Sequence, residues 1–391
     1  MPLASHDDDD DSSSLTTKTT KTKSTKTKTT ATDDYSPTAT SGDDSDDGSD
    51  SDATSTKSTK TKKSKTTKGS KATSTAAKAS TAAAVAATGS SVASSGSSSS
   101  SSGSGTSGSV FGYASLNGGT TGGASGSSVT ATSLEELTSY CAQDGALTIY
   151  VSGAISGSGD TVTVSGDKSV IGKSGASLTN IGLSIKGVSN VIIQNLSISK
   201  VVGTDAIRVQ KSQNVWLDHL DLSSDQDHGK DYYDGLIDIT HACDYVTVSY
   251  VHFHDHEKTS LVGHSDSNSS EDTGHLTVTY AYNFWENLNS RGPSLRFGTG
   301  HIYNNYYDNM SDCINIRKGA KALVENNVFA GSSSKGLYSV DGEGSAQASG
   351  NDFGSASDSI DSTTLSMEYQ YSLKDAGDVA SYVQSNAGAT L

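Results

Sequence analysis

Short segments rich in β-branched and aromatic residues recur along the second half of this 391-residue chain. Gly, Asn, Asp and Ser separate them, and they read NVIIQNLSI (190–198), NVWLDHLDL (214–222), YVTVSYVHF (245–253), HLTVTYAYNF (275–284), GHIYNNYYD (300–308) and ALVENNVFA (322–330). Alignment of the segments places six residues in one column, at separations of 24, 31, 30, 25 and 22 residues: Asn195, His219, Tyr250, Tyr280, Asn305 and Asn327. Repeats of this length, with strand-type alternation, predict a solenoid.

The repeats have room for two or three short strands each, and none contains a periodic segment of helix length. This excludes leucine-rich and helical repeats and predicts an all-β fold, a parallel β-helix. Polar side chains at Asn195, Asn305 and Asn327 are expected to bond along its axis, as side-chain ladders do. One segment, SLEELTSYCA (133–142), instead predicts an amphipathic helix that caps the first coil, with Ser133 as N-cap and Glu136 three residues later.

The composition changes sharply near residue 109. Residues 1–108 consist almost entirely of Ser, Thr, Lys, Asp, Ala and Gly, and such a segment cannot bury enough apolar surface to offset its chain entropy. We therefore predict a disordered tail over 1–108 and one solenoid domain over 109–391. The tail's lysines and aspartates cancel, so the net charge of −16 belongs to the body. An acidic body argues against nucleic-acid binding, and no apolar run is long enough to span a membrane.

The cellular location is read from the tail. A Ser/Thr-rich stalk is typical of secreted proteins, although MPLASHDDDD has no apolar segment of a signal peptide. We interpret the chain as a secreted protein whose signal peptide has been replaced by a Met; a cytosolic protein with a disordered tail is the alternative. Cys141, Cys243 and Cys313 are too few for a disulfide scaffold and leave the compartment and their pairing open.

Three aspartates form the first candidate site. Asp205 opens one repeat, and Asp234 and Asp238 lie near the start of the next. Hard cations such as Ca²⁺ take carboxylate oxygens as ligands, so these three from adjacent coils would make an open calcium site. In a regular strand, Leu236 would lie on the same face as Asp234 and Asp238 and place an apolar side chain among the ligands. A bend that places Asp234 in the loop removes this conflict. The alternative is a solvated acidic surface.

Three basic residues follow in the next two coils. Lys258 lies in HEKTSLVG (256–263), and Arg291 and Arg296 lie in RGPSLRFG (291–298), around a proline and two glycines. Stacked coils would align all three on one side of the solenoid. The alternative is a set of surface ion pairs. A cation site beside fixed positive charges is what an enzyme acting on a polyanion requires.

Four motifs carry a specific family resemblance: WLDH (216–219), YYDGLIDI (232–239), HEKTSLVG and RGPSLRFGTGHIYNNYY (291–307). They resemble signature blocks of the pectate lyase branch of the pectate/pectin lyase family, and GYASLNGGTTGGASG (112–126) and DKSVIGKSGAS (167–177) resemble its opening segments. The resemblance implies a right-handed parallel β-helix. It also implies Ca²⁺-dependent β-elimination on α-1,4-linked polygalacturonate, which leaves 4,5-unsaturated galacturonosyl ends.

The resemblance also implies the roles of individual residues. Asp205, Asp234 and Asp238 would be the Ca²⁺ ligands. Arg291 would be the catalytic base that takes the C5 proton, and Lys258 and Arg296 would bind substrate carboxylates. Asp218 and His219 of WLDH are expected to be structural. Two departures concern Gly203, where some members carry an aspartate, and Ser260, where a larger apolar residue is usual.

His252, His254 and His256 alternate along one predicted strand and would share a face, as a transition-metal trio would. They also fall in the segment that precedes the family's lysine, which favours a role in that motif instead.

Three other functions compete with pectate lyase. Pectin lyase acts on methyl-esterified polymer without Ca²⁺, and the three aspartates argue against it. A polygalacturonase needs clustered aspartates, and the body has no NTD or adjacent DD motif. A non-catalytic wall-binding solenoid would not need Arg291. We therefore predict a secreted, monomeric, Ca²⁺-dependent pectate lyase whose partner is plant cell-wall polygalacturonate, with no nucleic-acid or membrane partner.

Overall fold

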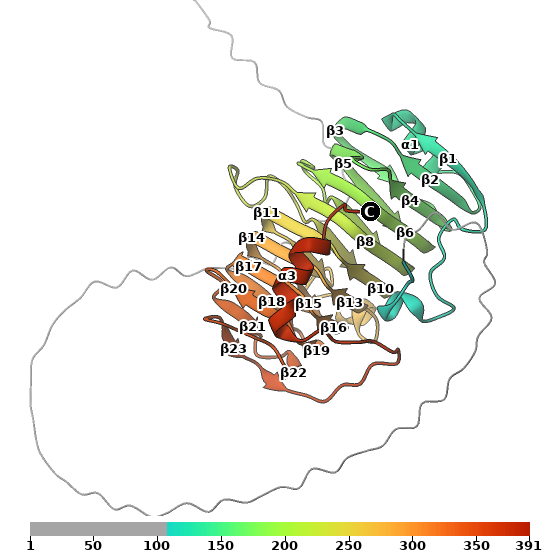
Figure 1. The fold of residues 1–391 in the computed structure, drawn as a ribbon. Coiled ribbons are helices and arrows are strands. Elements are labelled where there is room, and N and C mark those ends of the chain that lie inside the picture. Colours follow the sequence, from blue (N-terminus) through green and yellow to red (C-terminus); the bar gives the residue numbers. More distant parts are fainter. Residues whose placement is uncertain (1–107) are drawn as a thin grey trace, which may run out of the picture. The chain divides into compact units, whose positions relative to one another are not determined.

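The computed structural model describes residues 108–391, which form short strands wound into stacked coils (Figure 1). Pairings between the named strands are parallel, and each joins a strand to one in a neighbouring coil. The prediction of an all-β parallel β-helix is therefore confirmed. Disorder is predicted for residues 1–108. Of these residues, only Gly108 belongs to the described part of the chain.

Three parallel sheets run along the stack, and the long strands β3, β5, β6 and β8 bend so that their halves belong to different sheets. The first sheet contains β1 (Ser127–Ala131), β2 (Leu147–Val151), β4 (Lys168–Gly172), the first halves of β6 (Ser189–Ser199) and β8 (Gln213–Ser223), β10 (Asp244–Ser249), β13 (Thr277–Ala281), β16 (Thr299–Tyr303), β19 (Lys321–Glu325), β22 (Ser345–Ser349) and β24 (Asp361–Ser362). The second contains the first halves of β3 (Ala154–Thr163) and β5 (Ser177–Lys186), the second halves of β6 and β8, β11 (His252–Lys258), β14 (Phe284–Ser290), β17 (Tyr306–Met310) and β20 (Val328–Ala330). The third contains the second halves of β3 and β5, β7 (Ile207–Gln210), β9 (Ile237–Thr240), β12 (Ser260–Val262), β15 (Ser294–Arg296), β18 (Asp312–Arg317), β21 (Lys335–Tyr338) and β23 (Ser357–Ser359).

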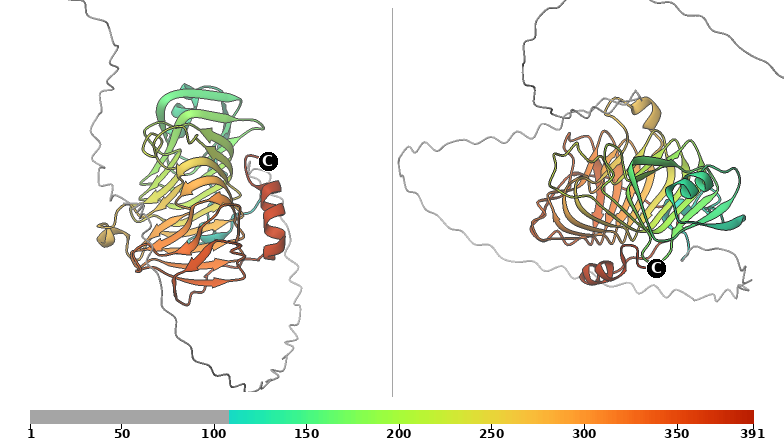
Figure 2. Two further views of the ribbon diagram at one scale, coloured as in Figure 1. Left: turned by 90° about the vertical axis from the view of Figure 1, so that its left-hand side faces the viewer. Right: turned by 90° about the horizontal axis from the view of Figure 1, so that it is seen from above.

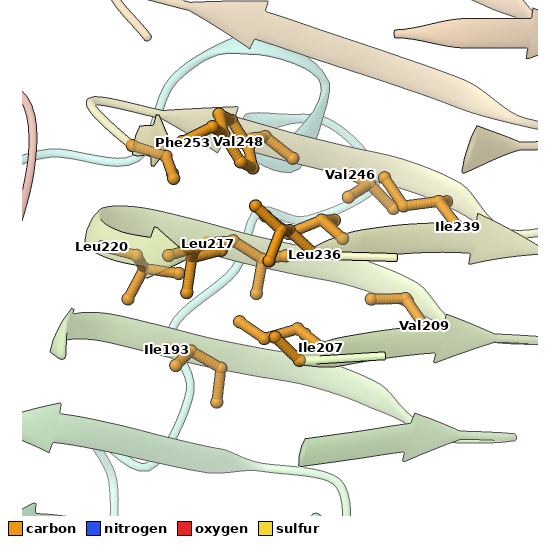
Figure 3. Packing of buried hydrophobic residues seen from close by; sticks show 14 of the residues in the cluster. Ile193, Ile207, Val209, Leu217, Leu220, Leu236, Ile239, Val246, Val248 and Phe253 are labelled. Carbon is orange, nitrogen blue, oxygen red and sulfur yellow. The ribbon is translucent and has the colours of Figure 1, made fainter. Parts of the chain in front are cut away.

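Aliphatic side chains from successive coils fill the interior of the stack. Alternation along β8 turns Leu217 inward, and Leu220 points inward again after the bend; both are fully buried. Leu217 pairs with Ile193 of the preceding coil, and Figure 3 shows these side chains in one continuous core. Burial of apolar surface, worth about 25 cal/mol per Å², is the main force that holds neighbouring coils together.

A column of left-handed residues turns the chain from the first sheet into the second. Its members have φ between 49° and 60°: Asn195, His219, Tyr250, Tyr282, Asn304 and Asn326. The predicted column is right for its first three members and wrong for the rest. Tyr280 lies two residues before the corner, opposite Val248 and in the core, and Asn305 and Asn327 lie one residue after the corner. The coil that ends at Tyr282 is longer than the alignment assumed, and Tyr280 offered a false match.

The expected polar ladder is present just beyond this corner, with partly different members. The side-chain amide of Asn283 donates to Oδ1 of Asn305, Asn305 donates to Asn327, and Asn327 donates to Asn351, at 2.9 to 3.0 Å. Asn195 is not part of the ladder, because its amide donates to the backbone carbonyl of Gly172. The ladder satisfies buried amides and fixes the register of four coils.

The helices lie outside the coils. The predicted helix is α1 (Leu134–Cys141), which contacts β1, β2 and β3, and the Oγ of Ser133 accepts a hydrogen bond from the backbone N–H of Glu136. The 3₁₀ helix η1 (Gly112–Ser115) covers the first sheet, and α2 (Ser269–Asp272) lies in the loop after β12. Helix α3 (Ala376–Asn386) runs along the second sheet and packs on Phe284 and Tyr306 (Figure 2). No described helix is long and apolar enough to span a membrane.

All three cysteines are buried and none forms a disulfide bond. Burial raises the pKa of each thiol to about 12, so Cys141, Cys243 and Cys313 act as small apolar core residues.

Candidate active site

Asp205 and Asp238 come from neighbouring coils of the third sheet. Asp205 lies just before β7, and Asp238 is the second residue of β9. Asp238 lies opposite Arg208 in the β7–β9 register and opposite Leu261 of β12 in the next coil. Parallel pairing thus brings together two carboxylates that are far apart in the sequence.

Both carboxylates are buried, with exposed fractions of 4% for Asp205 and 7% for Asp238. Asp205 accepts hydrogen bonds from the backbone N–H of Gly235 at 2.9 Å and from Nε of Arg208 at 2.8 Å. Asp238 accepts one from the backbone N–H of Leu261 at 3.0 Å. Burial raises the pKa of both carboxyl groups, and nearby carboxylates raise it further. The pair therefore gains from a bound cation.

Gly235 lies directly against both carboxylates. A Cβ atom at this position would lie 3.0 Å from Oδ1 of Asp205 and nearer still to Oδ1 of Asp238. Oxygens from both side chains thus meet at the same point beside Gly235, and a larger residue there would displace them. A set of carboxylate oxygens suits Ca²⁺ rather than a soft metal, so this part of the predicted site fits the ion.

Asp234 lies beside this pair but is turned toward Lys258. It sits in the loop before β9, and its carboxylate is 3.5 Å from Nζ of Lys258. Asp231 of the same loop is 3.1 Å from that ammonium. Across residues 108–391, the three predicted ligands do not all bring an oxygen within 4.8 Å of one another. The chain bends at Leu236, which is buried, and Asp234 lies in the loop before β9, as expected from the sequence.

Arg291 lies one coil beyond Lys258. Lys258, the last residue of β11, pairs with Ser290 of β14, and Arg291 follows directly. Its φ of 66° is left-handed, and its backbone carbonyl accepts a hydrogen bond from the N–H of Ser260 at 2.9 Å. The guanidinium makes no hydrogen bond or ion pair with any described residue, although its charge lowers the pKa of Asp238 against the effect of burial. A strained backbone that presents an unpaired guanidinium near the buried carboxylate of Asp238 is typical of a functional site.

Arg296 forms a separate group. Its side chain lies on β15, and Nε pairs with Asp266 at 2.5 Å, while Nη1 donates to the carbonyl of Gly263 at 3.0 Å. Arg317 lies opposite Arg296 in the next coil and pairs with the same Asp266 at 3.1 Å. Burial, and then the charge of Arg317, lowers the pKa of Arg296. Arg296 and Arg317 thus place two positive charges next to each other on the third sheet.

The pectate lyase family model matches residues 100–390. A probable pectate lyase A of Neosartorya fischeri is 54% identical over 287 residues, which cover 72% of this chain and 89% of that protein. The pectate lyase A of Aspergillus niger is 53% identical over 287 residues, which cover 72% and 88%. The chain belongs to the pectate lyase family. It is therefore a polysaccharide lyase.

The fold agrees with this membership. The crystal structure of a pectate lyase from Bacillus sp. N165 in complex with trigalacturonate aligns with a TM-score of 0.66. The two chains are 34% identical, and the alignment covers 72% of this pectate lyase and 98% of the other.

The structure brings Asp205 and Asp238 together beside Gly235 and sets Asp234 against Lys258. Arg291 directly follows the residue opposite Lys258, and Arg296 lies farther along the chain on β15. The WLDH residues lie elsewhere, at the corner between the first and second sheets, where Asp218 accepts hydrogen bonds from His219 at 2.7 Å and Ser249 at 2.6 Å. This position agrees with the structural role expected of them.

Sequence reasoning missed Arg208, Asp231, Asp266 and Arg317. Each pairs with a predicted site residue or with that residue's partner. Arg208 and Arg317 each lie one coil from a predicted residue, so the repeat spacing of the coils could have found them. The loop residues Asp231 and Asp266 carry no such signal.

The expectation that three histidines share one face is wrong. Asp255 has a φ of 52°, and this left-handed turn redirects the strand. His252 and His254 remain on the outer face with stacked rings, whereas His256 is buried, 2.6 Å from both Oγ of Ser224 and the carbonyl of Asp234. His256 thus supports the active-site loop.

Asp238→Asn should raise the melting temperature of chelator-treated protein near neutral pH. Because folding raises the pKa of Asp238, its stabilising contribution is complete below the unfolded value, near pH 4, and is lost as the pH rises through the folded value. The amide removes this loss and can still accept from Leu261. Thermal melts from pH 4 to 8 should show the two proteins diverging as the pH rises. A variant that melts lower than the parent at every pH would contradict the claim that the ionised carboxylate of Asp238 destabilises the fold.

Proposed function

We propose that this pectate lyase cleaves α-1,4-linked polygalacturonate by β-elimination, with Ca²⁺ held by Asp205, Asp234 and Asp238. The observation that carries the proposal is the pair of buried carboxylates that meet beside Gly235, together with the guanidinium of Arg291, whose charge acts on Asp238. Trigalacturonate in the complex of the Bacillus relative supports a galacturonate polymer as substrate.

Calcium held by these aspartates would neutralise the substrate carboxylate next to C5 and stabilise the negative charge that develops there. The ligands themselves would otherwise repel that substrate, because two like charges 4 Å apart cost about 4 kcal/mol at an effective dielectric constant near 20. Asp234 is the ligand that must move, since it is held by Lys258 at 3.5 Å. Substrate binding at Lys258 would release it.

Arg291 is the proposed base. It takes the proton from C5, the C5–H electrons form the C4–C5 double bond, and the C4–O bond breaks as the leaving oxygen takes a proton. No water is consumed. Arginine is normally protonated, so this role requires that neighbouring positive charge favour the neutral guanidine. Arg291 makes no hydrogen bond or ion pair with any described residue, so its guanidinium is free to contact the substrate.

Lys258 and Arg296 are proposed to bind substrate carboxylates. Each is already held by a carboxylate of the chain, Lys258 by Asp231 and Arg296 by Asp266. A galacturonate carboxylate would replace these partners at similar geometry, so the resident pairs keep the cations in position before substrate arrives. Lys258 ends β11, and Arg296 lies on β15 of the next coil, so a polymer that contacts both would cross neighbouring coils.

We also propose that the protein is a secreted monomer that acts on plant cell walls, with residues 1–108 as a disordered stalk and 109–391 as the lyase domain. The composition of the stalk supports this proposal.

The decisive assay compares polygalacturonate with its methyl-esterified form, with Ca²⁺ and with excess chelator. Conjugation of the new double bond to the carboxylate makes the product absorb in the ultraviolet. We expect absorbance to rise on polygalacturonate with Ca²⁺, to stop with chelator and to return when Ca²⁺ is restored. Full activity on the esterified polymer in chelator would instead indicate a pectin lyase, and no product on either would indicate a binding module.

Arg291→Lys should reduce kcat by several orders of magnitude while the protein stays folded. Loss of a general base alone costs roughly 10²–10⁴-fold, and loss of positioning adds to this. Arg317→Lys is the matched control and should leave kcat nearly unchanged, whereas Lys258→Ala and Arg296→Lys should mainly raise KM. If Arg291 were only structural, Arg291→Lys would melt slightly lower and remain active.

A further inference from the structure

A cluster of metal-ligating side chains lies on the outer face of the second sheet, outside the site described above. Asp221 of β8 pairs with His252 of β11, and His254 lies two residues further along the same strand. In the described part of the chain, these three form the single set of His, Cys, Asp or Glu side chains whose ligand atoms all lie within 4.8 Å of one another. The Asp255 turn separates them from Lys258 at the end of β11.

The distances within the cluster match metal ligands better than hydrogen bonds. Oδ2 of Asp221 is 3.5 Å from Nδ1 of His252, and Oδ1 is 3.5 Å from Nε2 of His254. Hydrogen bonds of this kind are about 2.7–3.2 Å long. Two ligand atoms bound about 2.0–2.1 Å from a tetrahedral ion lie roughly 3.3 Å apart, so an ion fits between these atoms with little movement.

Each histidine is oriented by a second carboxylate. Nε2 of His252 is 3.0 Å from Glu286, and Nδ1 of His254 is 2.9 Å from Asp255. With an ion bound, these carboxylates would hold the ring proton on the outer nitrogen, and the other nitrogen of each ring, which already faces Asp221, would be the ligand atom. Carboxylate–histidine–metal arrangements have this form.

The cluster is held firmly and is open to solvent. The two imidazoles stack with centroids 4.4 Å apart, and His252 also stacks on Phe284 at 4.7 Å. Exposed fractions of the side chains are 21% for His252, 23% for His254 and 35% for Asp221. An ion can therefore enter without local unfolding, and a water molecule can complete its coordination.

We propose that Asp221, His252 and His254 bind one divalent transition-metal ion of the Zn²⁺ class, with solvent as the fourth ligand. Two nitrogens and one carboxylate oxygen suit Zn²⁺ and its neighbours and do not suit Ca²⁺. The ion would join β8 to β11, which belong to adjacent coils, and so acts as a clip that stiffens the second sheet before the Asp255 turn. Glu286 and Asp255 are positioning residues for the two imidazoles.

The test uses the full chain, stripped with chelator and held in excess Ca²⁺ so that the proposed calcium carboxylates are occupied. Zn²⁺ binding is measured by equilibrium dialysis, and Co²⁺ is added as a probe whose visible absorption reports four-coordinate binding to nitrogen. We expect one ion per chain and a higher melting temperature with Zn²⁺. Asp221→Asn and His254→Gln should each lose both, while Glu286→Gln should bind 10–100-fold more weakly.

His241→Gln is the matched control. His241 also stacks on a histidine, at 4.5 Å, and pairs with Glu271, but belongs to no three-ligand set among the described residues. Its binding and its Zn²⁺-dependent melting shift should equal those of the parent. Thermal melts in chelator establish whether each variant is folded. If His254→Gln does not fold, Asp221→Asn alone tests the loss of the ligand. Absence of binding in the parent, equal binding by folded Asp221→Asn, or loss of the ion in His241→Gln would overturn the proposal.

Discussion

In-register parallel pairing between coils is the constraint on which the rest of this structure depends. A slip of one residue would exchange the inner and outer faces of a strand, and the aliphatic core and the asparagine ladder both prevent it. The same register sets Asp238 opposite Arg208 and Lys258 opposite Ser290, the residue before Arg291. The stability of the coil stack and the geometry of its site therefore have one cause.

The candidate site lowers the stability that this register gives to the fold. Asp205 and Asp238 are buried beside each other. Arg291 has a left-handed backbone, and its guanidinium has no hydrogen-bond or ion-pair partner in the described region. Both features cost free energy in the folded chain, and both become favourable once a cation and an anionic polymer are present. In the proposed mechanism, this arrangement would direct the binding energy of the substrate and of Ca²⁺ to the place where the proton is removed.

Much of this could be predicted from the sequence, because the repeats and the site motifs are local patterns. Alternation and spacing predicted the parallel β-helix, and Ser133 with Glu136 predicted α1. The errors arose where the backbone departs from a regular strand. Tyr280 was aligned with Tyr250 because a longer coil cannot be seen in the spacing, and His256 was placed with His252 because the turn at Asp255 has no sequence signal. Contacts made by loops, such as Asp266 with Arg296, depend on tertiary structure alone.

The central claim is that this site breaks the glycosidic bond by elimination. Cleavage of polygalacturonate in water enriched in heavy oxygen, followed by mass spectrometry of the products, tests this most directly. Elimination predicts that the new reducing ends carry no heavy oxygen, once exchange at the anomeric carbon is corrected for with a product standard, and that each cleavage leaves one unsaturated end. Heavy oxygen in the new ends at one atom per cleavage, with saturated products, would show hydrolysis and contradict the account.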